Sequence, residues 1–336
     1  MIKFPVLLYF SLLLSIATAH GEGKANTIEL EVQPGVESIR PLSKPAKLSL
    51  IVRDGSGKTV DRSRLQIRMF APAPGLILST DFPQVEGSPL LELEIPSSKG
   101  VAEWEYVFPI RGVYRLEVSA VDGTGQTVKR TFSLPIKETR AKLFYLGLFS
   151  AALFVFGFWV GRLFTPTSTS IASFFLWLGI TGLATGPAVA QEPTKEPTSE
   201  HELFIQQEVS PPTVGRLSEI RWRLFNKKTN EPSPARLTLV ITRLEKEKQI
   251  FALKQIPTDG TFAFKFNFFD GSLHQLTSKA EQRGKEPIQA TTNVSVRGVE
   301  PSKAISLRSL ALFLAVLFIG LITGRVTRKR KDRIHT

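Results

Sequence analysis

The hydrophobic pattern divides the chain into alternating stretches and long apolar runs. Between residues 27 and 137, apolar residues recur at every second position in a series of short runs. Turn signals such as Asp54-Gly-Ser-Gly57 separate these runs. A period of two is typical of strands with one buried and one solvent-exposed face. About seven such strands predict an immunoglobulin-like β-sandwich over residues 27–137.

Three apolar runs, at residues 143–163, 171–190 and 304–326, are long enough to cross a bilayer as helices. Residues 1–19 have the pattern of a secretory signal peptide, with Lys3 before an apolar core and Ala17-Thr-Ala19 at its end. An uncleaved anchor is the alternative. The run 171–190 also ends in a signal-peptidase pattern, Ala188-Val-Ala190. We therefore expect a second spanning helix there, and whether the chain is cut after Ala190 stays open.

The second half of the chain repeats the first. Residues 191–202 are rich in proline, glutamate and threonine and predict a linker. Residues 203–298 alternate again and predict a second immunoglobulin-like sandwich. Its aromatic stripe matches that of the first copy at a constant spacing (264 − 104 = 160): Phe264, Phe266 and Phe268 correspond to Trp104, Tyr106 and Phe108. We interpret both stripes as core, with carbohydrate stacking as the alternative, and place an insertion in the first copy around residues 71–87.

Two glycine pairs close two of the apolar runs. Gly157 and Gly161 precede Arg162, while Gly320 and Gly324 precede Arg325. Glycines four apart lie on one helix face and let another helix approach closely. The pairs predict that the first spanning helix packs on the third, or that the chain self-associates there.

Basic residues orient the predicted spans. Residues 327–336 form a basic tail, and the positive residues at the inner ends of the spans are Arg162, Arg325, Arg328, Lys329, Arg330 and Lys331. Such residues beside an apolar helix mark its cytoplasmic end. We expect a bacterial inner-membrane protein with both sandwiches in the periplasm and the tail in the cytoplasm. Because these basic residues lie directly beside an apolar helix, we interpret them as a topology signal and not as a nucleic-acid-binding site.

The amino-acid composition and the missing motifs exclude several kinds of functional site. The 336 residues include no cysteine, which excludes disulfides and thiolate metal sites. No nucleophile elbow, phosphate loop or zinc-protease motif is present, so we expect no enzyme activity, cofactor or small-molecule substrate. His20, His201 and His274 lie outside the predicted spans and are candidate copper ligands. The alternatives are a free end for His20, a linker for His201 and a strand-end corner for His274.

Part of the second sandwich resembles the YtkA-like and FixH-like envelope domains. The resemblance rests on Pro211-Pro-Thr-Val-Gly215, the turn at residues 226–234 and the run Phe268-Phe-Asp-Gly-Ser-Leu-His-Gln-Leu276. It implies a membrane-tied immunoglobulin-like module associated with copper handling or oxidase assembly. His274 is the one position it carries over as a ligand, and the first copy departs from it with Tyr114.

These patterns together predict a non-enzymatic membrane protein that serves as an accessory or assembly factor. Its expected partner is another membrane-protein complex, or a second copy joined through the glycine-containing helices. A periplasmic copper-binding chaperone that uses His20, His201 or His274 is one alternative. A transporter subunit is another, although the absence of charges at mid-depth in the spans weighs against it.

Overall fold

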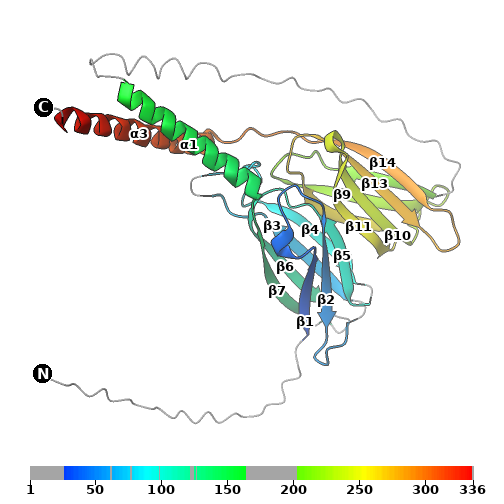
Figure 1. The fold of residues 1–336 in the computed structure, drawn as a ribbon. Helices are drawn as coiled ribbons and strands as arrows, with labels where there is room; N and C mark the ends of the chain where they lie inside the picture. The colour runs from blue at the N-terminus through cyan, green and yellow to red at the C-terminus, as the bar shows by residue number, and fades with distance from the viewer. Residues whose placement is uncertain are drawn as a thin grey trace, which may run out of the picture.

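The computed structural model describes residues 26–60, 63–75, 78–97, 99–121, 125, 127–163 and 203–334. Within these ranges the protein consists of two antiparallel seven-stranded sheets and two long helices (Figure 1). The predicted all-β architecture with apolar helices is confirmed at that level. The expected signal peptide at 1–19, the second spanning helix at 171–190 and the linker at 191–202 lie outside the described residues.

Each copy contributes seven strands, and those of the first copy fall where alternation predicts them. The first copy contains β1 (Thr27–Gln33), β2 (Ala46–Arg53), β3 (Arg64–Phe70), β4 (Pro89–Pro96), β5 (Val101–Tyr106), β6 (Gly112–Val121) and β7 (Thr127–Ile136), with a short 3-10 turn, η1, at Val36–Ser38. The second contains β8 (Leu203–Val209), β9 (Leu217–Asn226), β10 (Ala235–Arg243), β11 (Lys248–Thr258), β12 (Thr261–Asn267), β13 (Leu273–Glu281) and β14 (Ile288–Ser295), with η2 at Leu244–Lys246.

The sequence predicts two sandwiches in tandem, but the structure joins them sheet to sheet. One sheet has the order β1-β2-β5-β11-β10-β13-β14, and the other has the order β7-β6-β3-β4-β12-β9-β8. The three-stranded layer of each copy therefore continues into the four-stranded layer of the other. This exchange relates the copies by an approximate twofold axis, and it replaces two separate cores with one.

Aromatic side chains fill the core at the seam between the copies. Tyr106 on β5 pairs with Phe251 on β11, and Leu93 on β4 pairs with Phe264 on β12. The Phe251 ring centroid lies 5.5 Å from that of Phe264 and 5.3 Å from that of Phe266. All six residues of the two aromatic stripes are at most 3% exposed. Core packing of the stripes is therefore confirmed, and the carbohydrate-stacking alternative is wrong for these side chains.

The insertion in the first copy connects β3 to β4 and reaches the second copy. The Phe82 ring lies 5.2 Å from that of Phe269, nearly edge-on, and the Gln84 side-chain amide donates a hydrogen bond to the Val299 carbonyl at 2.7 Å. Gly215 has a φ of +80°, and a Cβ there would lie 2.4 Å from the Gln84 carbonyl oxygen. Glycine is thus required where the insertion touches the second copy.

Two helices extend from the double sandwich. They are α1 (Arg140–Leu163) and α3 (Lys303–Ile334), which lie against each other in Figure 1. The whole of α1 and the segment Lys303–Thr327 of α3 are long and apolar enough to cross a membrane. The predicted spans 143–163 and 304–326 fall inside them. The basic tail continues α3 to Ile334 because arginine and lysine are good helix formers.

A shared core predicts that the copies unfold together. Truncating Phe266, which is fully buried at the seam, should cost about 3–5 kcal/mol of unfolding free energy. In denaturant titrations, Phe266→Ala should lower the unfolding midpoint reported by the fluorescence of Trp104 in one copy. The midpoint reported by Trp222 in the other copy should fall by the same amount. Phe204→Ala, on the half-buried outer strand β8, is the control and should cost much less. Two separate transitions would contradict a single core.

Candidate functional site

The four predicted glycines lie where α1 meets α3. A Cβ on Gly157 would lie 2.3 Å from the Leu317 carbonyl oxygen, and one on Gly161 would lie 2.1 Å from that of Leu321. The reverse contacts match, at 2.3 Å from Gly320 to the Phe154 carbonyl and 2.1 Å from Gly324 to the Phe158 carbonyl. The backbones therefore approach so closely that only glycine fits at these positions.

The order of these contacts shows that the helices run parallel. Moving from Gly157 to Gly161 along α1 moves the contact from Leu317 to Leu321 along α3. The reciprocal contacts are those of a twofold-related pair, as in the sandwich. Both helices therefore leave the double sandwich in the same direction (Figure 1).

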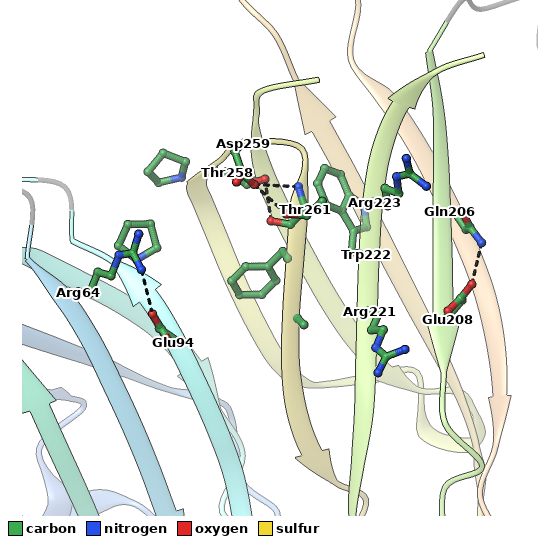
Figure 2. A pocket seen from close by; sticks show the side chains of 14 residues that line it. Arg64, Glu94, Gln206, Glu208, Arg221, Trp222, Arg223, Thr258, Asp259 and Thr261 are labelled. Atoms are coloured by element: carbon green, nitrogen blue, oxygen red, sulfur yellow. Dashed lines mark hydrogen bonds and ion pairs between the residues drawn. The ribbon is translucent and has the colours of Figure 1, made fainter. Parts of the chain in front are cut away.

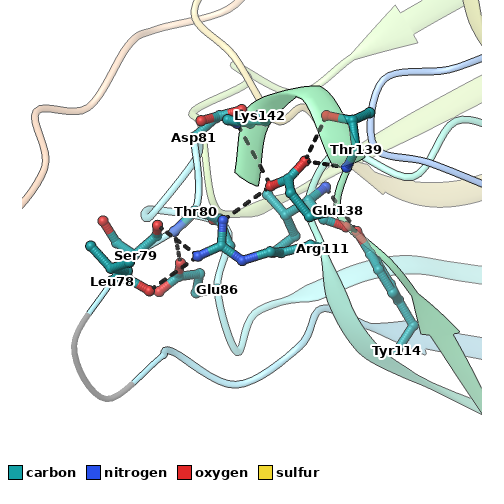
Figure 3. Close-up of polar contacts among 11 residues, drawn as sticks. Leu78, Ser79, Thr80, Asp81, Glu86, Arg111, Tyr114, Glu138, Thr139 and Lys142 are labelled. Carbon is teal, nitrogen blue, oxygen red and sulfur yellow. Dashed lines mark hydrogen bonds and ion pairs between the residues drawn. The ribbon is translucent and has the colours of Figure 1, made fainter. Parts of the chain in front are cut away.

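A polar junction fixes α1 to the first copy (Figure 3). Arg111 Nη1 lies 3.0 Å from Glu138 Oε2, and the Glu138 side chain is only 8% exposed. Glu138 Oε1 accepts the Thr139 backbone N–H at 3.0 Å, one residue before the helix begins. Lys142, in the first turn, forms ion pairs with Glu138 and with Asp81 of the insertion. The start of the helix is thus held by charges from the β5–β6 connection, the β7–α1 connection and the β3–β4 insertion.

The second copy buries a charged cluster near the start of β13. Nε of Arg243 lies 2.9 Å from Oδ2 of Asp270, and Nε2 of His274 lies 3.4 Å from Oδ1 of the same carboxylate. The Ser272 hydroxyl donates to Asp270 Oδ1 at 2.5 Å, and Glu245 forms an outer ion pair with Arg243. His274 is fully buried, and Asp270 is 9% exposed.

The hydrogen bonds of His274 leave one ring nitrogen without a good partner. Nδ1 faces the Ser272 carbonyl oxygen at 3.0 Å, so Nδ1 must carry a proton and donate it. A neutral ring then directs the lone pair of Nε2 toward the Asp270 carboxylate, and Nε2 has no hydrogen-bond partner in the protein. Burial lowers the pKa of His274, with Arg243 adding to the effect, although Asp270, the Ser272 carbonyl and Glu245 oppose it. The fold therefore favours the neutral ring, which is hydrogen-bonded at Nδ1 only.

In the first copy, an uncharged, hydrogen-bonded side chain fills the corresponding position. Tyr114, the counterpart of His274, donates its hydroxyl to the Ile110 carbonyl at 2.7 Å and accepts the Ile110 N–H at 2.9 Å. Our sequence interpretation of His274 as a strand-end residue identified the corner but not the roles of Asp270 and Arg243. The spacing of Asp270 four residues before His274 was the available signal. Arg243 gave none, because it comes from a distant strand.

A cleft opens between the copies where their strands diverge (Figure 2). Pairing of β4 with β12 ends at Leu93 and Phe264, although both strands continue, and the space beyond measures about 730 Å³. Its charges are balanced. Three arginines and three acids line it: Arg64, Arg221, Arg223, Glu94, Glu208 and Asp259. Hydrogen bonds from Thr261 lower the pKa of Asp259, and Arg64 lies 3.8 Å from Glu94. The cleft thus combines balanced charges with apolar side chains such as Trp222 and Phe262.

The remaining predicted site residues do not converge. His20 and His201 lie outside the described residues. Arg162 and Arg325 are exposed on α1 and α3, and residues 328–331 belong to α3. No three histidine, aspartate, glutamate or cysteine side chains of the described ranges group closely enough to hold a metal ion. At His274 the neighbouring arginine disfavours a cation.

The glycine contact predicts a sharp difference between two substitutions on one helix. Gly161→Leu should force α1 and α3 apart, whereas Gly147→Leu should not, because a Cβ on Gly147 meets nothing within 4 Å. The chain has no cysteine, so Phe149→Cys with Phe313→Cys, whose native rings lie 5.2 Å apart, provides a clean crosslink. We expect its yield to collapse with Gly161→Leu and to persist with Gly147→Leu. Equal yields would show that the glycines do not set the contact.

The buried histidine predicts a pH dependence of stability. Its folded pKa is lowered, so the unfolded chain binds more protons near the ordinary histidine value of about 6.5. The free energy of unfolding should therefore fall as pH drops from about 7 to 5. His274→Phe, which keeps an aromatic ring beside Phe268, should flatten this slope in denaturant titrations. A double variant of His20 and His201 to alanine is the control and should retain it. An unchanged slope in His274→Phe would assign the effect elsewhere.

Comparisons with known proteins add only distant likenesses. No family model and no curated protein matches the chain. Among solved structures, a conjugative transposon lipoprotein from Bacteroides eggerthii aligns at 10% identity and a TM-score of 0.21, over 28% of this chain and 98% of that one. Alpha-2-macroglobulin of E. coli aligns at 9% identity and a TM-score of 0.25, over 82% of this chain but only 14% of its own length. At such scores neither match establishes a shared fold.

Proposed function

We propose that this chain is a non-enzymatic protein of the bacterial inner membrane. It presents a fused pair of β-sandwiches to the periplasm and serves as an accessory or assembly factor for a membrane-protein complex. The parallel glycine contact between α1 and α3 carries the proposal. Two apolar helices that leave one rigid body side by side suit an anchor that holds a binding module at a fixed orientation.

The parallel helices support a specific threading. If both cross the bilayer away from the sandwiches, the chain must cross back between Leu163 and Leu203. The 39 residues from 164 to 202 (202 − 164 + 1) exceed the roughly 20 that a spanning helix needs. The apolar run 171–190 then supplies the return crossing. The signal peptide and the basic tail favour the same orientation.

An immunoglobulin-like assignment for each sandwich draws support from strand order and from one side chain. Each copy places its first, second and fifth strands in one layer and its remaining four in the other. Tyr114, at the start of β6, bonds back to Ile110, which is the arrangement of a tyrosine corner. Domains of this type commonly bind other proteins through edges and loops, which agrees with an assembly role.

The alternatives are less well supported by geometry. Copper bound at His274 would need the Asp270 carboxylate as a second ligand. Arg243 Nε already lies 2.9 Å from Oδ2 of that carboxylate, and its positive charge would repel the metal ion. Ion transport would need a polar path, and α1 carries no charge between Lys142 and Arg162. In the cleft between the copies, Arg64 pairs with Glu94 and Gln206 with Glu208, while Arg221 and Arg223 bond to groups outside the lining.

Threading predicts a labelling pattern in cysteine variants of this naturally cysteine-free chain. Ser56→Cys and Thr229→Cys, on exposed turns of the two sandwiches, should react with a membrane-impermeant maleimide in intact spheroplasts. Thr167→Cys and Thr336→Cys should react only after the membrane is permeabilised. Labelling of Thr336→Cys from outside, or protection of Thr229→Cys, would refute the proposed orientation.

A further inference from the structure

The two sheets end in four outer strands, β1, β14, β7 and β8. An outer strand presents unpaired backbone groups that another chain can join, and proteins usually guard such strands with charges or proline. Charged residues or a proline guard three of them: Glu29 and Glu31 on β1, Lys129, Arg130 and Pro135 on β7, and Glu208 on β8. Among these four described strands, only β14 has neither a charge nor a proline.

The internal repeat provides a matched comparison for β14. Its counterpart is β7, at the same spacing of 160 residues (294 − 134 = 160). Lys129, Arg130 and Pro135 of β7 correspond to Gln289, Ala290 and Ser295 of β14 by this spacing. The guarding residues are thus missing from one copy only. The fold of the copy does not demand an unguarded strand, because β7 occupies the same place with its guards.

The backbone of β14 has a regular row of outward-facing groups. Val296 N–H donates to the Ser272 carbonyl at 3.4 Å, which makes this a hydrogen-bonded pair in register with β13. Hydrogen-bonded pairs alternate with non-bonded pairs along an antiparallel ladder. The backbone N–H and C=O groups of residues 294, 292, 290 and 288 therefore point toward β13. The N–H and C=O groups of Gln289, Thr291, Asn293 and Ser295 therefore face outward. Their side chains are all exposed.

A groove of about 500 Å³ runs beside this edge. Its lining combines β14 with the segment after β8: Val209, Pro211, Pro212, Thr292, Asn293, Val294, Ser295 and Arg297. An added strand would need room for the side chains that it turns toward the sandwich, and the groove supplies that room next to Thr292 and Val294.

We propose that β14 is a docking edge on which an extended segment of a partner protein adds as an eighth strand of the sheet. This inference rests on the proposed assembly function and specifies how the partner is held. Main-chain hydrogen bonds to the four outward residues provide the affinity, and the groove selects side chains on the inner face of the added strand.

Geometry favours a separate partner over this chain itself. Antiparallel pairing of β14 with β14 of a second copy would bring Arg297 of one copy close to Arg283 and Lys285 of the other, and like charges repel. Residues 191–202 carry Pro193 and Pro197, which interrupt strand pairing. Exposed basic residues outnumber acidic ones at the ends of β14: Arg283 and Lys285 with Glu286 before it, and Arg297 after it. We therefore infer an uncharged β-forming segment with acidic residues at its ends.

The experiment uses the full chain in detergent and a short synthetic peptide of alternating threonine and valine with glutamates at both ends. Amide hydrogen exchange is followed with and without millimolar peptide. The peptide should slow exchange about tenfold or more at residues 289, 291, 293 and 295, which corresponds to about 1.4 kcal/mol. Residues 129, 131 and 133 of β7 should show no change.

Two variants and one control complete the test. Thr291→Pro removes an outward N–H without touching the ladder to β13, so the fold should persist while protection is lost. Asn293→Lys keeps the backbone intact and adds a charge of the kind that guards β7. Thr131→Pro, the matched change on β7, should leave protection of β14 intact. Unchanged exchange on β14 with peptide, or equal protection of β7, overturns the proposal, while the maleimide labelling that tests the anchoring is unaffected by either result.

Discussion

Edge-to-edge pairing at the seam is the interaction on which the rest of the structure depends. Only three residue pairs join β5 to β11, and three join β4 to β12, yet they bring Tyr106, Phe251, Phe264 and Phe266 into one apolar layer. Without the other copy, each half would expose two long inner strands with their aromatic side chains. Burial of these rings makes the double sandwich a single body, and the cleft opens only where the pairing stops.

The same approximate twofold relation recurs in the helices. Reciprocal contacts of Gly157 with Leu317 and of Gly320 with Phe154 repeat, between α1 and α3, the exchange seen in the sheets. The Arg111–Glu138–Lys142 junction links the two levels on the side of the first copy. Orientation of the sandwiches is thereby transmitted to the anchor through packed backbone and buried charge rather than through a flexible stalk.

Local patterns in the sequence predicted much of this structure, whereas long-range pairing was not predictable from them. Alternation located the strands, and the Gly157 and Gly320 pairs marked the surfaces where the helices meet. Fusion of the sheets was not foreseen, because a seam strand such as β5 alternates just as outer strands do. The Arg243–Asp270–His274 cluster was also missed in part, since one member comes from a strand far away in sequence. Pairing between strands that are far apart in the sequence depends on how their side chains fit together. A short stretch of sequence does not contain that information.

The different corners at Tyr114 and His274 have an evolutionary consequence. In a symmetric dimer of separate chains, every substitution appears twice, so a change that suits one subunit is imposed on the other. Fusion into one polypeptide removes that coupling. One half can retain the neutral tyrosine hydrogen bonds that stabilise the corner, while the other is free to acquire a buried ionisable group. Duplication with fusion thus lets one half conserve stability while its twin explores new chemistry.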